Sequence, residues 1–122
     1  MPFFRRLAAV TASLLIALPT MAGDIDHFKG EPAKTLEQAV TNFSKYNNQL
    51  ETLLAGELSP AVMGQIHQLT YSLENALETL DDSIDQLEDS LEEVHKASER
   101  ADTTTVKSSG KQYLTNSRKI IP

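Results

Sequence analysis

The sequence predicts an all-α protein, and three observations support this fold class. From Thr35 onward, apolar residues recur at steps of three and four, as they do along one face of an α-helix. Ser59-Pro60 supplies an N-cap followed by a proline at the first helical position, where its missing N–H costs nothing. No Gly or Pro interrupts the chain from Gln65 to Thr105. We therefore expect helical hairpins built on one long central helix: a helix at 35–55, the central helix at about 60–101 and a last helix at 103–121.

The first 22 residues have the three parts of a signal peptide. Arg5 and Arg6 give a basic start to an apolar run that ends at Leu18, and the residues before Gly23 are small enough for a cleavage site. The run is shorter than the ~20 apolar residues of a membrane span. We expect cleavage after about Ala22, export to the periplasm and no stable membrane span in the mature chain; the alternative is a retained membrane anchor.

Composition excludes several classes of protein. The chain has 17 acidic and 11 basic residues, for a net charge of −6, which argues against nucleic acid or anionic lipid as a partner. With no cysteine, it can form neither a disulfide nor a thiolate zinc site, and it cannot use a thiol in catalysis. We find no catalytic arrangement of side chains and expect no enzymatic activity.

The segment before the first helix predicts an extended arm at 23–34. It has no periodicity and contains Gly30 and Pro32. The helix after it begins with a capping box, Thr35 to Gln38, and its pattern stops at Gly56. We expect the mature chain to consist of this arm and a single helical domain at 35–122.

The central helix carries the longest apolar pattern. Its steps fit a heptad repeat, except for one extra residue between Leu73 and Leu77, a stutter of the kind that coiled coils tolerate. The cluster Asp81-Asp82-Ser83 resembles an N-cap and would allow a turn at 81–83, giving a four-helix up-down bundle. The apolar phase passes through this cluster unbroken, which favours a continuous helix.

Charge and length predict how the last helix packs. Residues 74–93 contain nine acids and no base, whereas 106–122 contain four bases and no acid, so we expect the last helix to fold back on the acidic half of the central one. The first helix would then cover only the N-terminal half. A layer two helices thick leaves apolar surface exposed, and a homodimer with a four-helix section would bury it.

Two histidines raise the question of a metal or haem site. On a continuous helix His67 and His95 are 28 residues, thus ~42 Å, apart. They would meet only across a turn at 81–83 or between two chains paired in antiparallel. Met63 and His67 stand at i, i+4, and Met with His is a haem axial pair, although such ligands come from opposite sides of the porphyrin.

Other residues could support weaker metal binding. Glu92 and His95 form one Glu-x-x-His, whereas a di-iron bundle needs two of these motifs. His27 lies fifth from the expected new N-terminus, so it could join the compact amino-terminal copper chelate only if cleavage occurred two residues later. The candidate metal ligands are therefore His67, His95, Glu92, Met63 and His27.

Several segments resemble a family of small exported gammaproteobacterial proteins that is known only as a domain of unknown function. They are Asp26 to Gly30, Thr35 to Asn47, Ile66 to Leu77 and Leu91 to Ser98. The resemblance implies a periplasmic, all-helical protein and brings no activity or cofactor. It draws attention to Phe28, Tyr71 and Asn75 as partner contacts, and Tyr71 also lies off the main apolar stripe.

The leading functional hypothesis is a non-enzymatic periplasmic protein that acts through protein contacts, with itself or with another periplasmic protein. A metal or haem carrier using His67 and His95 is the first alternative. A chaperone-like stress protein that binds unfolded clients is the second.

Overall fold

The computed structural model describes residues 28–122, so the predicted signal peptide and His27 lie outside the described part of the chain. Three helices follow one another: α1 (Leu36–Leu54), α2 (Pro60–Glu99) and α3 (Thr103–Ile120). The described residues contain no strand. The prediction of an all-α fold built on one long central helix is confirmed.

The central helix runs through Asp81-Asp82-Ser83 without a break, so the alternative turn at 81–83 is wrong. The Ser83 hydroxyl donates to the carbonyl of Thr79, one turn earlier, at 2.7 Å. Because this bond lies within the helix, Ser83 does not act as a cap. The two aspartates remain exposed on the helix surface.

Each helix begins at an N-cap side chain that accepts a backbone N–H: Thr35, Ser59 and Asp102. The end of α2 comes two residues before the predicted Ala101. Ala101 adopts a left-handed backbone with φ 55°. Its N–H donates to Ser98 at 3.1 Å and that of Asp102 donates to Ala97 at 2.9 Å, which closes the helix as a Schellman motif.

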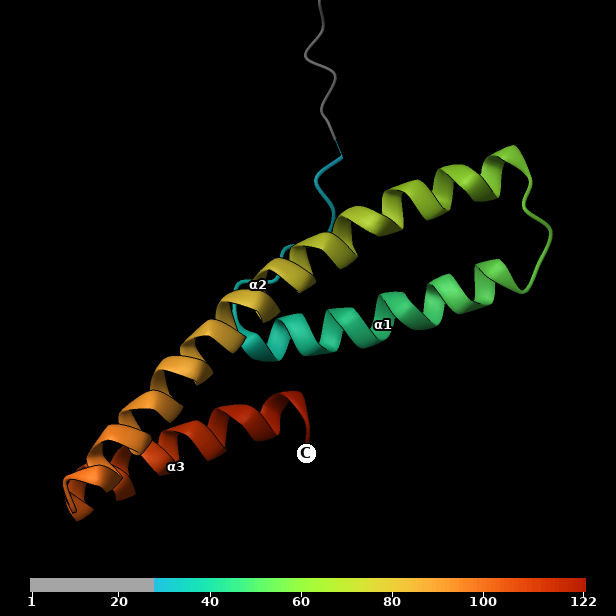
Figure 1. Cartoon of the computed structure of the whole chain (residues 1–122). Helices are drawn as coiled ribbons and strands as arrows, with labels where there is room; N and C mark the ends of the chain where they lie inside the picture. The colour runs from blue at the N-terminus through green and yellow to red at the C-terminus, as the bar shows by residue number, and fades with distance from the viewer. Residues whose placement is uncertain (1–27) are drawn as a thin grey trace, which may run out of the picture.

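The two shorter helices share the length of α2 (Figure 1). α1 packs along its N-terminal half, and α3 folds back along its C-terminal half. The beginning of α1 and the end of α3 meet near the middle, where Lys119 and Glu37 form an ion pair of 2.7 Å. The described part of the molecule is therefore a layer about two helices wide.

The docking of α3 on α2 agrees with the prediction, but the expected charge pairing is absent. The ion pair of α3 goes to α1, through Lys119, and α2 and α3 share no ion pair within residues 28–122. α3 is instead linked to α2 by a hydrogen bond from an uncharged group: the Ser109 hydroxyl donates to the Glu93 carboxylate at 2.7 Å.

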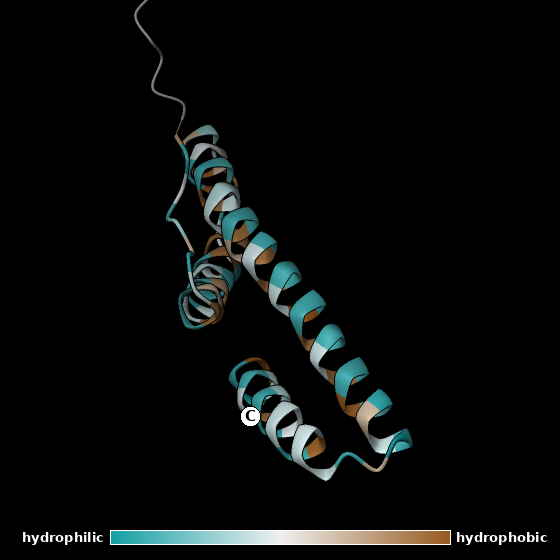
Figure 2. Ribbon diagram, turned by 90° about the vertical axis from the view of Figure 1, so that its left-hand side faces the viewer, coloured by the Kyte–Doolittle hydropathy of each residue, from teal (hydrophilic) through white to brown (hydrophobic). Residues whose placement is uncertain are grey.

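Small side chains form the centre of the packing. Ala39, Ala76 and Ala97 have no exposed surface, whereas no large side chain among the described residues is fully buried. Figure 2 shows the hydrophobic colour mainly on the sides of the helices that face one another. No helix within residues 28–122 is both long and apolar enough to cross a membrane.

The continuity of α2 can be measured in solution. Spin labels at positions 67 and 95, in a chain diluted with unlabelled protein, should give a mean distance of about 40 Å, because 28 helical residues rise ~1.5 Å each. A mean distance near 10 Å would contradict the continuous helix.

Candidate functional site

The arm, residues 28–35, lies across α1 and α2, and side chains of both helices hold its main chain. From α2, the Asn75 amide donates to the carbonyls of Lys29 and Glu31 at 2.8 and 3.1 Å. The Glu31 N–H donates to the Ser72 hydroxyl at 2.9 Å. Two further carbonyls accept from the helices: Pro32 from Asn42 and Ala33 from Thr79. Side chains of α1 and α2 therefore take the place of water as hydrogen-bond partners of the arm's peptide groups.

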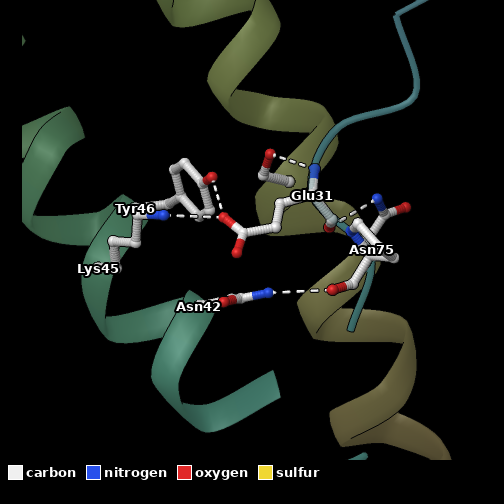
Figure 3. A network of polar contacts seen from close by, with 7 residues as sticks. Glu31, Asn42, Lys45, Tyr46 and Asn75 are labelled. Atoms are coloured by element: carbon white, nitrogen blue, oxygen red, sulfur yellow. Dashed lines mark hydrogen bonds and ion pairs between the residues drawn. The ribbon is translucent and has the colours of Figure 1, made fainter. Parts of the chain in front are cut away.

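Glu31 is the centre of a polar cluster between the arm and α1 (Figure 3). Its carboxylate accepts from the Lys45 ammonium at 2.8 Å and from the Tyr46 hydroxyl. These two bonds, Lys45 first, hold the pKa of Glu31 below its ordinary value. The same pairing raises the pKa of Lys45. Both groups are open to solvent, so the cluster positions the arm more than it stabilises the fold.

Gly30 lets the arm approach α2 closely. Its φ is +74°, in the left-handed region that favours glycine. A Cβ at this position would lie 2.7 Å from the backbone of both Tyr71 and Ser72. Any other residue would therefore have to lift the arm off the helix.

A groove between α1 and α2 begins where the arm turns. Its volume is about 750 Å³, and it is open to solvent on one side. Phe28, Leu53 and Leu69 give it an apolar lining, and the amides of Gln65 and Gln68 continue from α2 toward the helix start. Glu31 and Tyr46, which are hydrogen-bonded to each other, also line this groove.

The side of α2 away from the arm is a second surface. Ser72 and Thr79 face the arm, and a shift of five positions along a helix turns it through about 140°. Leu77 and Ile84, five positions after these two residues, therefore point nearly the opposite way. Four large apolar side chains at multiples of seven residues make up this surface, which we call the bare face: Met63, Leu77, Ile84 and Leu91. They are 45–52% exposed.

The stutter between Leu73 and Leu77 marks the point on α2 after which small residues occupy the position that packs against the other helices. Before it, the line of α2 that packs on α1 contains the buried Leu69. After it, the same line continues in steps of seven through small residues, Ala76, Ser83, Ser90 and Ala97. Leu77, Ile84 and Leu91 each stand one residue after a member of this line. α1 and α3 can then approach α2 closely and leave these large side chains uncovered.

The structure separates the candidate metal ligands. His67 and His95 lie on one continuous helix, ~42 Å apart. His95 pairs with Glu99 at 3.2 Å, and Glu92 pairs with Lys96 at 3.1 Å. Met63 is exposed one turn from His67 on the bare face. One chain therefore does not bring the two histidines together.

Residues 28–122 contain no group of three or more His, Asp or Glu side chains placed to hold a metal ion. His27 lies outside the described residues. Metal or haem binding, including a site shared between two chains, remains a prediction.

The candidate partner contacts cluster around the arm. Tyr71 stacks edge-on with His67, with ring centroids 5.1 Å apart, and its hydroxyl lies 3.3 Å from His67 Nε2. The Phe28 ring also packs edge-on against Tyr71, with ring centroids 6.1 Å apart. Asn75 binds the arm of its own chain. Contact of these residues with a partner remains a prediction.

Sequence reasoning missed Glu31 on the arm itself and three of the side chains that bind the arm: Asn42, Ser72 and Thr79. A signal for them exists. Ser72, Asn75 and Thr79 form an uncharged polar line at helical spacing within a strongly acidic helix. Such a line indicates a face that binds polar groups without repelling or attracting charge.

Comparison with known proteins gives a family and no function. The model of DUF6746, a family of unknown function, matches residues 1–122. No curated protein and no solved structure matches the chain.

Two glycine substitutions test the close approach of the arm. Gly30→Ala should lower the free energy of unfolding by about 1–3 kcal/mol, because the residue is left-handed and its Cβ would overlap the α2 backbone. Gly64→Ala is the control, since its Cβ would meet nothing within 4 Å. Because Gly64 lies within α2 and alanine favours a helix more than glycine does, this substitution should raise the free energy of unfolding by up to about 1 kcal/mol. Urea denaturation followed by circular dichroism measures both, and equal effects would contradict the role of Gly30.

Proposed function

Since the chain belongs to the DUF6746 family of unknown function, we infer its role from its own surfaces and propose an exported, non-enzymatic protein that pairs with a second copy of itself. Its place of action in this proposal is the periplasm, as the signal-like N-terminus indicates. It acts through protein contacts.

The observation that carries the proposal is the bare face. Four large apolar residues on one side of α2 stay about half exposed, while α1 and α3 occupy the neighbouring side. Isolated exposed leucines are common on soluble proteins, but a series at seven-residue spacing is the pattern of a helix that packs against another helix. The seam between two such helices would cover it.

The small apolar core of a single chain also supports self-association. The fully buried positions are alanines, which bury little apolar area each. A helical layer of this kind gains most from a partner that covers its open side. A second copy supplies that cover with the same sequence of apolar residues, as an isologous dimer requires.

Export is tested by the mass of the mature protein. The chain recovered from the periplasmic fraction should begin at about Gly23, since small residues precede it. A full-length chain that starts at Met1 and stays with the cytoplasm would contradict export without affecting self-association.

Self-association is tested by sedimentation equilibrium. The mature protein should be a dimer at micromolar concentration. The double variant Ile84→Gln/Leu91→Gln should raise the dimer Kd by about 1000-fold, because four half-buried side chains per dimer lose roughly 1 kcal/mol each.

The control is Leu58→Gln, in the loop before α2, which removes a side chain of similar exposure, 50% against 45% for Ile84. It should leave the Kd unchanged. A wild-type protein that sediments as a monomer, or a double variant that dimerises normally, would remove the proposal.

A further inference from the structure

The bare face of α2 continues onto α3. Gly110 adjoins α2, because a Cβ on it would lie 3.9 Å from Cγ2 of Val94. Leu114, one turn after Gly110, is 47% exposed on the same edge of α3. Leu91 lies one turn before Val94 on the adjoining edge of α2. One apolar surface therefore spans both helices in the C-terminal half of the layer.

This surface has charges of opposite sign along its two outer edges. Three acids stand one turn before bare-face residues on α2: Glu74, Asp81 and Glu88. Three bases stand around Leu114 on α3: Lys107, Lys111 and Arg118. Across its width, the surface changes from acidic through apolar to basic.

Within the described part of the chain, none of these three bases forms an ion pair. In residues 28–122, the lysines that form ion pairs are Lys45, Lys96 and Lys119. Lys107 and Lys111 stand two positions on either side of Ser109, the residue of α3 that is buried against α2. Two helical positions turn about 200°, so both ammonium groups point away from the α2 of their own chain.

Two symmetric arrangements can cover the surface with a second copy. A two-fold axis across the helices would place α2 on the partner's α2, with acid against acid. A two-fold axis along the helices would place α2 on the partner's α3, with acid against base. Like charges placed opposite each other oppose binding, and opposite charges favour it.

We propose that the second copy docks with its α3 on the acidic edge of α2, and with its α2 on the basic edge of α3. This inference rests on the proposed self-association and adds its orientation. The contact lengths agree: Leu77 to Leu91 spans ~21 Å and Lys107 to Arg118 spans ~17 Å at 1.5 Å per residue. The result is a four-helix section, closed by one two-fold axis.

Charge reversal tests the orientation. One variant reverses the acidic edge, Asp81→Lys/Glu88→Lys, and another reverses the basic edge, Lys111→Glu/Arg118→Glu. Each alone should raise the dimer Kd by about tenfold or more, because like charges then meet at both symmetric contacts. The two variants mixed should form a heterodimer of near wild-type Kd, because both contacts then pair opposite charges.

The matched control reverses the next residues along the same helix, Asp82→Lys/Asp89→Lys. It changes net charge by the same amount, but these side chains point about 100° further from the bare face. Its Kd should stay within a few-fold of wild type. Raising NaCl from 0.05 to 0.5 M should weaken the wild-type dimer, since screening removes attraction between its edges.

The outcomes separate the two proposals. A dimer that depends on Ile84 and Leu91 but tightens with salt, or that tolerates both edge reversals, overturns this orientation and leaves self-association standing. A monomeric wild-type protein overturns both. Equal weakening by the edge and control variants also overturns the orientation, because net charge alone would then explain the effect.

Discussion

The line of small residues on α2 determines the rest of the structure. Ala76 and Ala97 lie on this line and are completely covered, so α1 and α3 come close to the central helix along one narrow strip. Close approach gives good packing contacts but buries little apolar area per residue. Leu77, Ile84 and Leu91 follow the line by one helical position and stay 45–49% exposed. The arm adds contacts on one side of the layer, and in the dimer that we propose the second copy would add them on the other.

The two sides of the helical layer are chemically different. On the arm side, uncharged polar residues such as Asn75 and Ser72 bind peptide groups, with Glu31 fixed by Lys45 and Tyr46. On the opposite side, the bare face offers apolar groups between charged edges. Within the described residues, the arm therefore contacts one side of the layer, whereas the large apolar side chains of the bare face on the other side stay about half exposed.

Periodicity and caps were enough to predict the three helices from the sequence. The unbroken apolar periodicity around Leu80 correctly predicted a continuous helix despite the cap-like Asp81-Asp82-Ser83. The two aspartates lie exposed on the helix surface and do not interrupt it. The sequence predicts an end of α2 at about Ala101, two residues later than the observed end at Glu99, because no glycine marks the left-handed position. Arm binding could not be predicted, because periodicity reports only on neighbours along a helix. Beyond the capping box, the bonds of the arm join residues 10–15 positions apart on α1 and 41–46 positions apart on α2. For the same reason, the sequence could not show which residues of the apolar stripe of α2 are covered by α1 and α3 and which stay exposed.

The way in which the arm is held determines which substitutions it tolerates. At Lys29, Pro32 and Ala33 the helices contact carbonyl oxygens, which every amino acid possesses. The side chains at Lys29 and Pro32 are largely free to change as long as the backbone keeps its course. At Gly30 the backbone itself leaves no alternative. The arm can therefore diverge in chemistry while keeping its shape, and it could present different outward side chains to solvent from one chain to another without disturbing the helices beneath.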